Sequence, residues 1–311
     1  RALKLPGYWK KDWFIGLVVM LLFLLLSVSD NLRSLEWWAY DLGVRFSSSR
    51  TANQDVILIA IDDDAIRRLG SWPWPRDELA RVTDKLSAME PGVIGYAVPL
   101  DTKQSNYGSR YIAKIKKAIR QKKANTRYID GLLRSAEEGL DTDRLFARSL
   151  KDAGPVVLAM PYDLDPDTES NRNLSLPVAL KRFTVDVSNV PDRDGWFART
   201  FTSSPVPVAD SVYPPISELS RYVTAIGHLN TGLNIQEQAR REPLIMQYGK
   251  EYLPSFSFMV VARYLRLTAG NVQLKLGDQI TIAKHSIETD DQYRVYPYFY
   301  RGKNNNSPFK T

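Results

Sequence analysis

The feature that most constrains the fold is an uncharged apolar segment near the start of the chain. From Trp13 to Val28 the sequence reads WFIGLVVMLLFLLLSV, which is 16 residues without a charge. A helix needs roughly 20 residues to cross a bilayer, and Ser29 extends the segment at little cost. Trp13 stands where an interfacial aromatic residue is expected. We therefore predict a transmembrane helix over residues 13–29.

The charges that flank this segment predict its orientation. It is preceded by four basic residues, Arg1, Lys4, Lys10 and Lys11, and followed by Asp30, Arg33 and Glu36. Because Lys and Arg accumulate on the cytoplasmic side of membrane helices, we expect residues 1–12 to form a basic cytoplasmic N-terminus. Residues 30–311 are then extracytoplasmic.

A cleaved signal peptide is the alternative interpretation of the same segment. Its apolar region is normally shorter and is followed by an Ala-x-Ala site. Here apolar residues continue at helical spacing through Leu32, Leu35 and Leu42. This pattern favours an uncleaved anchor whose helix continues beyond the membrane.

Composition narrows the chemistry that the chain can perform. The 311 residues suffice for one large domain or two small ones, and the absence of cysteine excludes disulfides and thiol chemistry. The two histidines, His228 and His285, are far apart in the sequence, so a histidine-based metal site is not expected. The sequence contains neither a Gly-rich phosphate loop nor a nucleophile elbow. We expect no cofactor, no metal and no catalytic constellation.

Beyond residue 30, apolar runs alternate with helical patterns. Asp55–Ile61 (DVILIAI) is typical of a buried strand, residues 76–89 have helical spacing, and Gly92–Val98 is the next apolar run. Together they predict a β-α-β unit with a right-handed crossover. Further elements are predicted at 145–153 (helix), 156–160 (strand), 216–223 (helix, followed by AIGHLN), 254–265 (helix), 279–283 (strand) and 293–300 (strand). We predict an α/β fold with a mostly parallel sheet and flanking helices, preceded by one N-terminal transmembrane helix.

Two stretches depart from this alternation, at residues 103–140 and 162–211. In the first, Ile112, Ile115 and Ile119 mark one face of a basic amphipathic helix. Its basic residues are Lys103, Arg110, Lys114, Lys116, Lys117, Arg120, Lys122, Lys123, Arg127 and Arg134. They indicate either a solvated face or a contact with lipid headgroups or an acidic partner. The second stretch is rich in Asp, Pro, Ser and Asn, and is interpreted as a long surface excursion.

The candidate site residues lie in IDDDAIRRLGSWPWPR, directly after the first predicted strand. Ligands of open parallel sheets bind beyond the carboxyl ends of the strands, which is where Asp62 and Asp63 stand. Trp72 and Trp74 each precede a proline and are expected to be extended, so that one covers the end of the sheet. Arg76 is expected to pair with Asp62 or Asp63 and lock the turn. All five residues are either structural or in contact with a ligand.

The same stretch carries a resemblance to a known family. Together with LRSLEWWAYDLGVRF, GVIGYAVPL, DRLFARSLKDAGPVVLA, AIGHLN and PSFSFMVVARYL, it resembles the second type of CHASE domain, a sensory extracellular domain associated with cyclases and histidine kinases. The resemblance covers residues 30–302 apart from the two excursions, and IDD…LGSWPWPR is its most specific part. It adds Asn230, in AIGHLN, to the candidate ligand-binding or structural residues.

The resemblance implies an input domain rather than an enzyme. The expected protein is a bacterial inner-membrane signalling protein that relays a periplasmic signal to a cytoplasmic output domain, such as an adenylate cyclase or a kinase. Its expected partners are the lipid bilayer and either a second copy or other membrane subunits, whereas nucleic acid is not expected. The family normally continues past the YFYRG strand, so the domain is expected to be incomplete at its C-terminal end.

Departures from the family pattern favour a second function. Ala97 stands where the family strand usually ends in an acidic residue, and IQEQARR replaces an Asp-x-Asp-Gly stretch. Excursions from such a core often carry partner contacts. The alternative is therefore a non-enzymatic envelope scaffold, or a protein-binding subunit of a membrane complex, that has kept the sensor fold.

Overall fold

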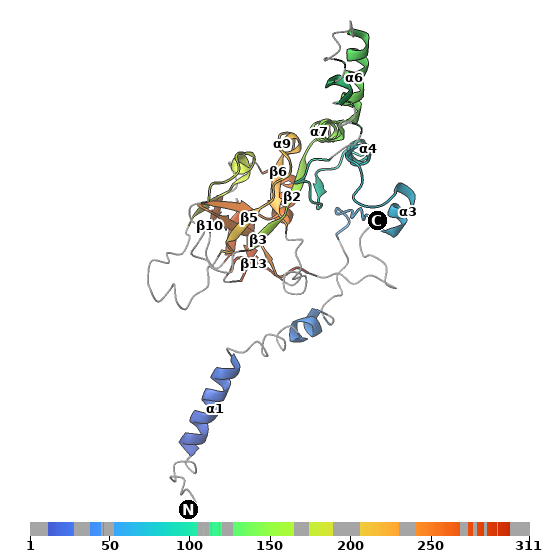
Figure 1. Ribbon diagram of the computed structural model, residues 1–311. Helices are drawn as coiled ribbons and strands as arrows, with labels where there is room; N and C mark the ends of the chain where they lie inside the picture. Colours follow the sequence, from blue (N-terminus) through green and yellow to red (C-terminus); the bar gives the residue numbers. More distant parts are fainter. Residues whose placement is uncertain are drawn as a thin grey trace, which may run out of the picture. The chain divides into compact units, whose positions relative to one another are not determined.

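The fold was analysed in a computed structural model of the chain (Figure 1). It describes residues 12–27, 38–44, 46, 53–104, 108, 112, 114–117, 119, 127–164, 174–188, 206–229, 241–267, 273–275, 279–282, 285–290 and 292–298. The chain divides into two compact units. One contains residues 1–61 and 298–311, and the other contains residues 62–297.

The first unit contains the apolar N-terminal segment. Helix α1 (Asp12–Ser27) covers most of the predicted span of 13–29, and residues 38–44 form a second helical segment with Trp38 exposed. Among the described residues, no helix combines the length and the apolar character that crossing a membrane requires. The assignment of residues 13–29 as a transmembrane helix stays a prediction.

The strand predicted at Asp55–Ile61 is absent. Within it only Ile57 makes a β-bridge, and Val56, Ile57, Leu58 and Ile59 are all more than half exposed. The apolar run indicated that these side chains favour burial, but such a run carries no information on which strand would pair with it. The predicted β-α-β unit is therefore wrong in its first strand.

The second unit is built on a parallel sheet of three strands, in the order β1-β2-β6. Its strands are β1 (Ile94–Tyr96), β2 (Val156–Met160) and β6 (Ala225–His228). Ile94 aligns with Val156, and Val157 in turn aligns with Ala225. All five residues of β2 are buried, as the apolar run VVLAM predicted for a central strand.

Helices cover both faces of this sheet. Tyr96 of β1 packs edge-to-face on Phe146 of α7 (Thr142–Asp152) and its hydroxyl lies 2.6 Å from that of Thr83 in α4 (Arg76–Ser87). Gly95 points to the other face, where a Cβ atom would meet Phe256 of α11 (Phe256–Tyr264) at 2.9 Å. The strand alternation thus places α4 and α7 on one face and α11 on the other, a three-layer α/β/α arrangement.

The helices begin where the sequence supplies capping groups. Pro75 precedes α4, whose first turn carries Asp77 and Glu78, as favours the positive end of the helix dipole. Asp141 accepts a hydrogen bond from the amide of Arg144 at the start of α7, and Ser255 does the same for Phe258 at the start of α11. The remaining helical elements of this unit are α3 (Asp63–Leu69), α6 (Arg127–Leu140), η2 (Val178–Phe183) and α9 (Ser217–Ser220).

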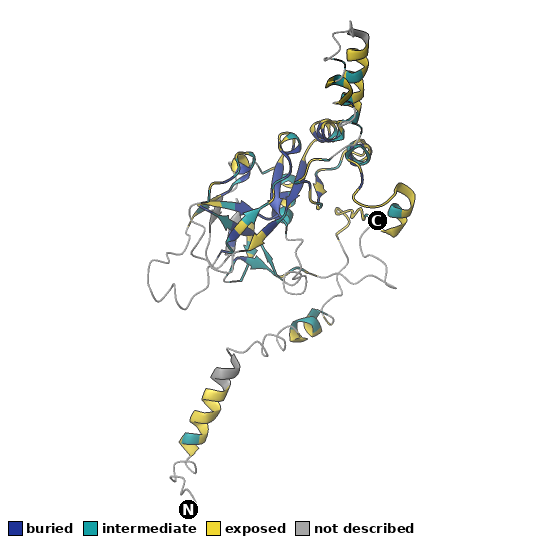
Figure 2. Ribbon diagram, in the orientation of Figure 1, coloured by how far each residue is buried: buried dark blue, intermediate teal, exposed yellow. Residues whose placement is uncertain are grey.

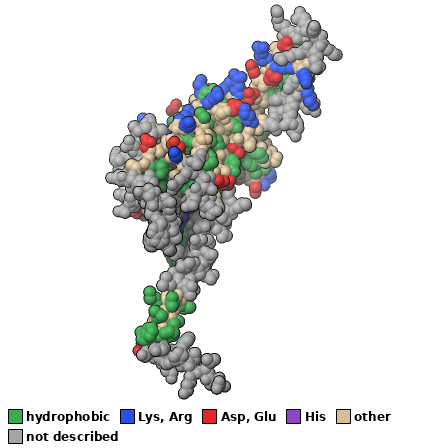
Figure 3. Space-filling model, turned by 60° about the vertical axis from the view of Figure 1, so that its left-hand side comes forward, with side chains coloured by type: hydrophobic (Ala, Val, Ile, Leu, Met, Phe, Trp, Pro, Cys, Tyr) green, Lys and Arg blue, Asp and Glu red, His purple; other side chains and the backbone are tan. Residues whose placement is uncertain are grey.

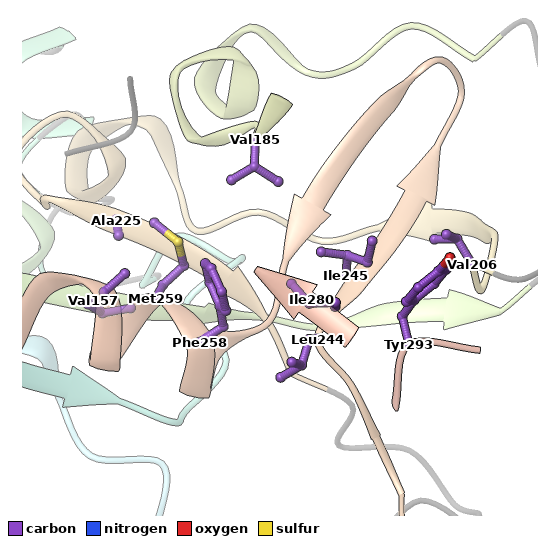
Figure 4. Packing of buried hydrophobic residues seen from close by; sticks show 11 residues of the cluster. Val157, Val185, Val206, Ala225, Leu244, Ile245, Phe258, Met259, Ile280 and Tyr293 are labelled. Carbon is purple, nitrogen blue, oxygen red and sulfur yellow. The ribbon is translucent and has the colours of Figure 1, made fainter. Parts of the chain in front are cut away.

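The main hydrophobic cluster joins the parallel sheet to α11 and to the strands beyond it (Figure 4). Val157 and Ala225 contribute from the sheet, Phe258 and Met259 from α11, and Ile245 from β8 (Ile245–Tyr248). Burial of side chains of this size contributes roughly 1.5–3 kcal/mol each. Figure 2 shows that buried residues concentrate in the sheet and on the helix faces turned toward it.

Antiparallel pairs make up most of the remaining strands, so the prediction of a mostly parallel sheet holds only for the central one. The pairs are β3 (Tyr162–Leu164) with β5 (Ala209–Val212), β8 (Ile245–Tyr248) with β9 (Glu251–Pro254), and β13 (Arg294–Val295) with β7 (Glu242–Pro243). A mixed sheet contains β12 (His285–Glu288), β11 (Gln279–Ile282), β10 (Gln273–Lys275) and β4 (Asp186–Ser188).

The described parts of the stretch at 162–211, which are residues 162–164, 174–188 and 206–211, contain regular secondary structure. They contribute β3, η2, β4 and most of β5, and Leu180 and Phe183 of η2 are buried. Apolar residues that are widely spaced in a polar stretch give no regular period, so their burial could not be read from the pattern.

Candidate functional site

The carboxyl edge of the parallel sheet gathers three segments, one from each strand. Leu100 follows β1, and its carbonyl accepts a hydrogen bond from the amide of Ile216, just before α9. Pro161 follows β2, and its carbonyl accepts from the amide of Tyr213. Leu229 follows β6 and donates to the carbonyl of Met160. This edge is where ligands bind in open α/β folds.

A rigid aromatic turn lies directly before α4. The Trp72–Pro73 peptide bond is cis, and the two indoles of Trp72 and Trp74 pack edge-to-face with their ring centroids 5.7 Å apart. Trp74 is buried, and its indole N–H donates to the carbonyl of Gly70 at 2.9 Å. Trp72 remains 38% exposed. The turn therefore buries one aromatic residue as structure and presents the other to a potential partner.

The two aspartates have a local role instead of pairing with Arg76. The carboxylate of Asp62 accepts a hydrogen bond from the amide of Ala65 at 2.8 Å and so caps α3, whose first residue is Asp63. Both aspartates are exposed. A side chain that caps its own helix is held close to that helix. The predicted pair between Arg76 and Asp62 or Asp63 is therefore wrong.

Arg76 pairs instead with Asp143, in the first turn of α7. The guanidinium Nε lies 3.4 Å from the carboxylate Oδ1, and the two side chains are only 11% and 10% exposed. The distance is long for a charge-assisted hydrogen bond, and Oδ1 has no hydrogen-bond partner. Arg76 also donates to the carbonyl of Thr102 at 3.2 Å. The pair joins the N-terminal ends of α4 and α7.

Gln104 links both members of this pair. Its side-chain oxygen accepts from the amide of Arg76 and from the hydroxyl of Thr142, each at 2.7 Å. Its own amide donates to Oδ2 of Asp143 at 2.9 Å. We refer to Arg76, Thr102, Gln104, Thr142 and Asp143 as the ion-pair cluster.

Burial is the largest cause of the pKa shifts of both charged residues in this cluster. It lowers the pKa of Arg76, an effect that the neighbouring carboxylate of Asp143 only partly offsets. It raises the pKa of Asp143, although the hydrogen bond from Gln104 and the charge of Arg76 both oppose the rise. Desolvation therefore exceeds the attraction between the partners, as is common for buried ion pairs.

His228 occupies the same edge of the sheet, at the end of β6. It is 2% exposed, and its ring packs edge-to-face on Tyr162 with centroids 5.2 Å apart. Burial lowers the pKa of His228 to about 3, so the imidazole is neutral at physiological pH. Its Nε2 has no hydrogen-bond partner. From the sequence we inferred only that His228 is not part of a histidine-based metal site. No sequence pattern predicted that its side chain is buried.

The structure brings together only part of the predicted site. Trp72, Trp74 and Arg76 lie in or directly after one turn, whereas Asp62 caps a separate helix, α3, whose first residue is Asp63. Asn230 lies outside the described residues. Sequence reasoning missed Gln104, Thr142 and Asp143. The pattern DTD before a helical period marks a helix start, but it does not reveal that Asp143 points at Arg76.

The described residues contain no group of three or more acidic or histidine side chains that could hold a metal ion. The polar side chains described above are an ion pair, the amide of Gln104, the hydroxyl of Thr142 and, separately at the end of β6, a buried neutral histidine. Such a set binds and orients, and in the part of the chain that is described it includes no nucleophile beside a base. The fold is thus that of a mixed α/β domain with a small parallel sheet and flanking helices.

Comparison with protein families identifies the domain more closely. A model of the CHASE2 domain family matches residues 16–311. The chain therefore belongs to the CHASE2 domain family, whose members are extracellular sensory domains of signalling proteins and are themselves non-catalytic. The resemblance seen in the sequence is confirmed. Neither the curated proteins nor the solved structures contain a significant match to this chain.

Proposed function

We propose that this domain is the periplasmic input domain of a bacterial inner-membrane signalling protein, and that it passes a signal to a cytoplasmic output domain. In this proposal residues 13–29 anchor it in the membrane, with residues 1–12 in the cytoplasm. The exposed Trp38 and Leu42 on the helical segment at 38–44 provide apolar surface for a contact with a second copy. A relative movement of two such helices is a simple way to carry the signal.

The observation that supports an input site is the buried, incompletely satisfied ion-pair cluster. Its two charges stand on different helices, α4 and α7, and Arg76 directly follows the turn that exposes Trp72. A ligand that supplies a better partner to Arg76 or Asp143 gains that interaction and shifts the two helix ends relative to each other. Ligand binding changes a conformational equilibrium only through such differential contacts.

The proposal is tested in the full-length signalling protein. Arg76→Lys and Asp143→Asn keep side-chain size but weaken the pair, so we expect each to change the basal activity of the output domain. Arg81→Ala is the matched control, because Arg81 lies on α4 but is exposed. Circular dichroism verifies that all three variants fold. An output activity that is the same in both folded pair variants as in the parent protein would contradict a sensory role for the cluster.

A further inference from the structure

One carboxylate oxygen of the ion-pair cluster is closed to ligands of molecular size. Oδ1 of Asp143 is buried and has no hydrogen-bond partner, whereas Oδ2 accepts from the amide of Gln104. Nε of Arg76 lies 3.4 Å from Oδ1, and the two side chains are only 11% and 10% exposed. The helices that carry them, α4 and α7, pack against each other. A molecule can contact Oδ1 only after the helices have parted, whereas a proton can reach it in the folded domain.

Among the described charged groups near this carboxyl, Arg76 is the only buried cation. The groups on its own helix and on the elements packed around it are Arg76, Asp77 and Glu78 on α4, Asp101 and Lys103 after β1, Asp141 before α7, and Glu218 on α9. Lys103 is exposed and pairs with Glu218, and the two acidic residues of α4 pair with an arginine on the same helix. The exposed Asp141 opposes the ionisation of Asp143 through its charge. Arg76 is therefore the counter-charge on which ionised Asp143 depends.

Ionised Asp143 is unfavourable in this environment. Burial raises the pKa of Asp143, although the hydrogen bond from Gln104 and the charge of Arg76 both oppose the rise. The folded domain therefore takes up a proton on Asp143 at a higher pH than an unfolded chain does. The stability that this carboxyl contributes is complete in acid and is lost as the pH rises through its raised pKa.

Protonation of Asp143 changes the environment of Arg76. A neutral carboxyl no longer compensates the guanidinium, which is then a buried charge without its main partner. Asp101 is the other carboxylate whose charge acts on Arg76, and it is only half-buried. Arg76 already donates to the carbonyl of Thr102, the next residue along the chain. Loss of the pair therefore favours a guanidinium that turns toward this segment and no longer joins α4 to α7.

We propose that the ion-pair cluster is an acid-sensitive switch, in which protonation of Asp143 releases Arg76 and lets the N-terminal ends of α4 and α7 move apart. The step forms one O–H bond on the carboxylate with a proton from the solvent, and it needs no other reactant. CHASE2 domains are extracellular sensory domains, so the acidity outside the cell acts on this carboxyl. The inference rests on the proposed input function for its effect on the output, and it names the proton as the signal.

The separation of the two helices provides a direct readout, because the chain has no native cysteine. Spin labels are attached to the full chain at Arg81→Cys on α4 and Arg144→Cys on α7, two exposed positions. Pulsed electron paramagnetic resonance then measures their distance from about pH 7.5 to about pH 4.5, which is above the ordinary aspartate pKa of about 3.9. We expect the distance to increase on acidification as a single proton binds.

Asparagine substitutions identify the carboxyl that titrates. Asp143→Asn is neutral at every pH, so it should show the longer distance at neutral pH and no step in acid. The matched control is Asp152→Asn, an exposed position at the other end of α7, which should keep the step of the parent protein. If circular dichroism shows that Asp143→Asn does not fold, Arg76→Gln replaces it, because the partner that protonation releases is then already absent and the step should vanish.

The output activity of the full-length signalling protein separates this inference from the proposed input function. We expect Asp143→Asn at neutral pH to match the acidified parent protein. A parent distance that stays constant down to about pH 4.5, or a step that the Asp143 variant retains, overturns the switch, even where both pair variants alter the output and the input function stands. A step that is lost in the Asp143 variant, with an output that neither acid nor the pair variants change, supports the switch and contradicts the input function.

Discussion

Arg76 and Asp143 stand on helices that are far apart in the sequence, yet each supplies the other's main counter-charge. Both side chains are almost fully buried, so neither charge can recover its hydration if the partner is removed. Gln104 fixes the orientation of the carboxylate but leaves one of its oxygens without a hydrogen bond. The pair is thus costly to break although it is imperfectly formed.

Replacing Arg76 tests that cost. We expect Arg76→Ala to lower the free energy of unfolding by about 3 kcal/mol, because Asp143 is left as an unpaired buried charge. Arg67→Ala is the control, since its ion pair with Asp64 is exposed and should contribute almost nothing. Urea denaturation measures both variants. If the free energy of unfolding of Arg76→Ala equals that of the parent protein, the carboxylate of Asp143 does not need the charge of Arg76 as its partner.

His228 makes stability depend on pH in a predictable direction. The folded protein keeps this imidazole neutral, because burial lowers its pKa to about 3, whereas the unfolded chain protonates it near pH 6.5. Its contribution is therefore complete above pH 6.5 and is lost as the pH falls from 6.5 toward 3. Between pH 7 and pH 5 the loss amounts to about 2 kcal/mol.

The contribution of His228 is isolated by comparing two variants. His228→Gln should reduce the fall in unfolding free energy between pH 7 and pH 5 by that amount, whatever its effect at pH 7. His285→Asn replaces a histidine on the exposed strand β12 and serves as the comparison variant. Chemical denaturation at both pH values provides the measurement. An identical pH dependence in all three proteins would show that the buried imidazole does protonate in the folded state.

Strand β6 and helix α11 approach each other closely, backbone to backbone. A Cβ atom on Gly227 would lie 2.5 Å from both the Cα of Phe256 and the carbonyl oxygen of Ser255. Both are backbone atoms, so no side-chain rotation relieves the clash. This approach aligns His228 with Ser255 in a β-bridge and places the start of α11 at the carboxyl edge of the sheet.

Gly227→Ala should therefore destabilise the fold by about 1–3 kcal/mol, because β6 and α11 must move apart. Gly131→Ala is the matched control in α6, where nothing lies within 4 Å of the added atom. There alanine should stabilise the helix by up to about 1 kcal/mol. Thermal unfolding distinguishes the two substitutions by the sign of the change in Tm. A Gly227→Ala protein that melts at the parent temperature would argue against the close packing.

The elements that were predictable from the sequence are those whose apolar pattern and capping residues lie within or next to the element itself. The run VVLAM gave β2 within its true bounds, and helical spacing with capping residues gave α4, α7 and α11 to within a few residues. Asp55–Ile61 shows the limit, since an apolar run needs a partner that its own sequence does not specify. The partner of Arg76 was missed for the same reason: Asp62 and Asp63 were closer in sequence, but Asp62 caps its own helix.

At the scale of the whole molecule, the placement across a membrane is open to direct measurement. We expect Val178→Cys, in the second unit, to react with a membrane-impermeant maleimide in intact spheroplasts, because Val178 is 83% exposed and the chain has no other cysteine. Lys4→Cys, in the basic N-terminus, should react only after lysis. Labelling of Val178→Cys that also requires lysis would contradict the extracytoplasmic placement.

The junction between α6 and α7 has a mechanical consequence. Asp141 separates the two helices, and Asp143 lies two residues beyond it, whereas α6 extends 14 residues to the other side. At 1.5 Å per residue the two arms measure roughly 3 Å and 21 Å. The far end of α6 therefore stands about seven times farther from Asp141 than the buried carboxylate-bearing residue does, so a contact made there is remote from the ion pair although only one residue separates the two helices.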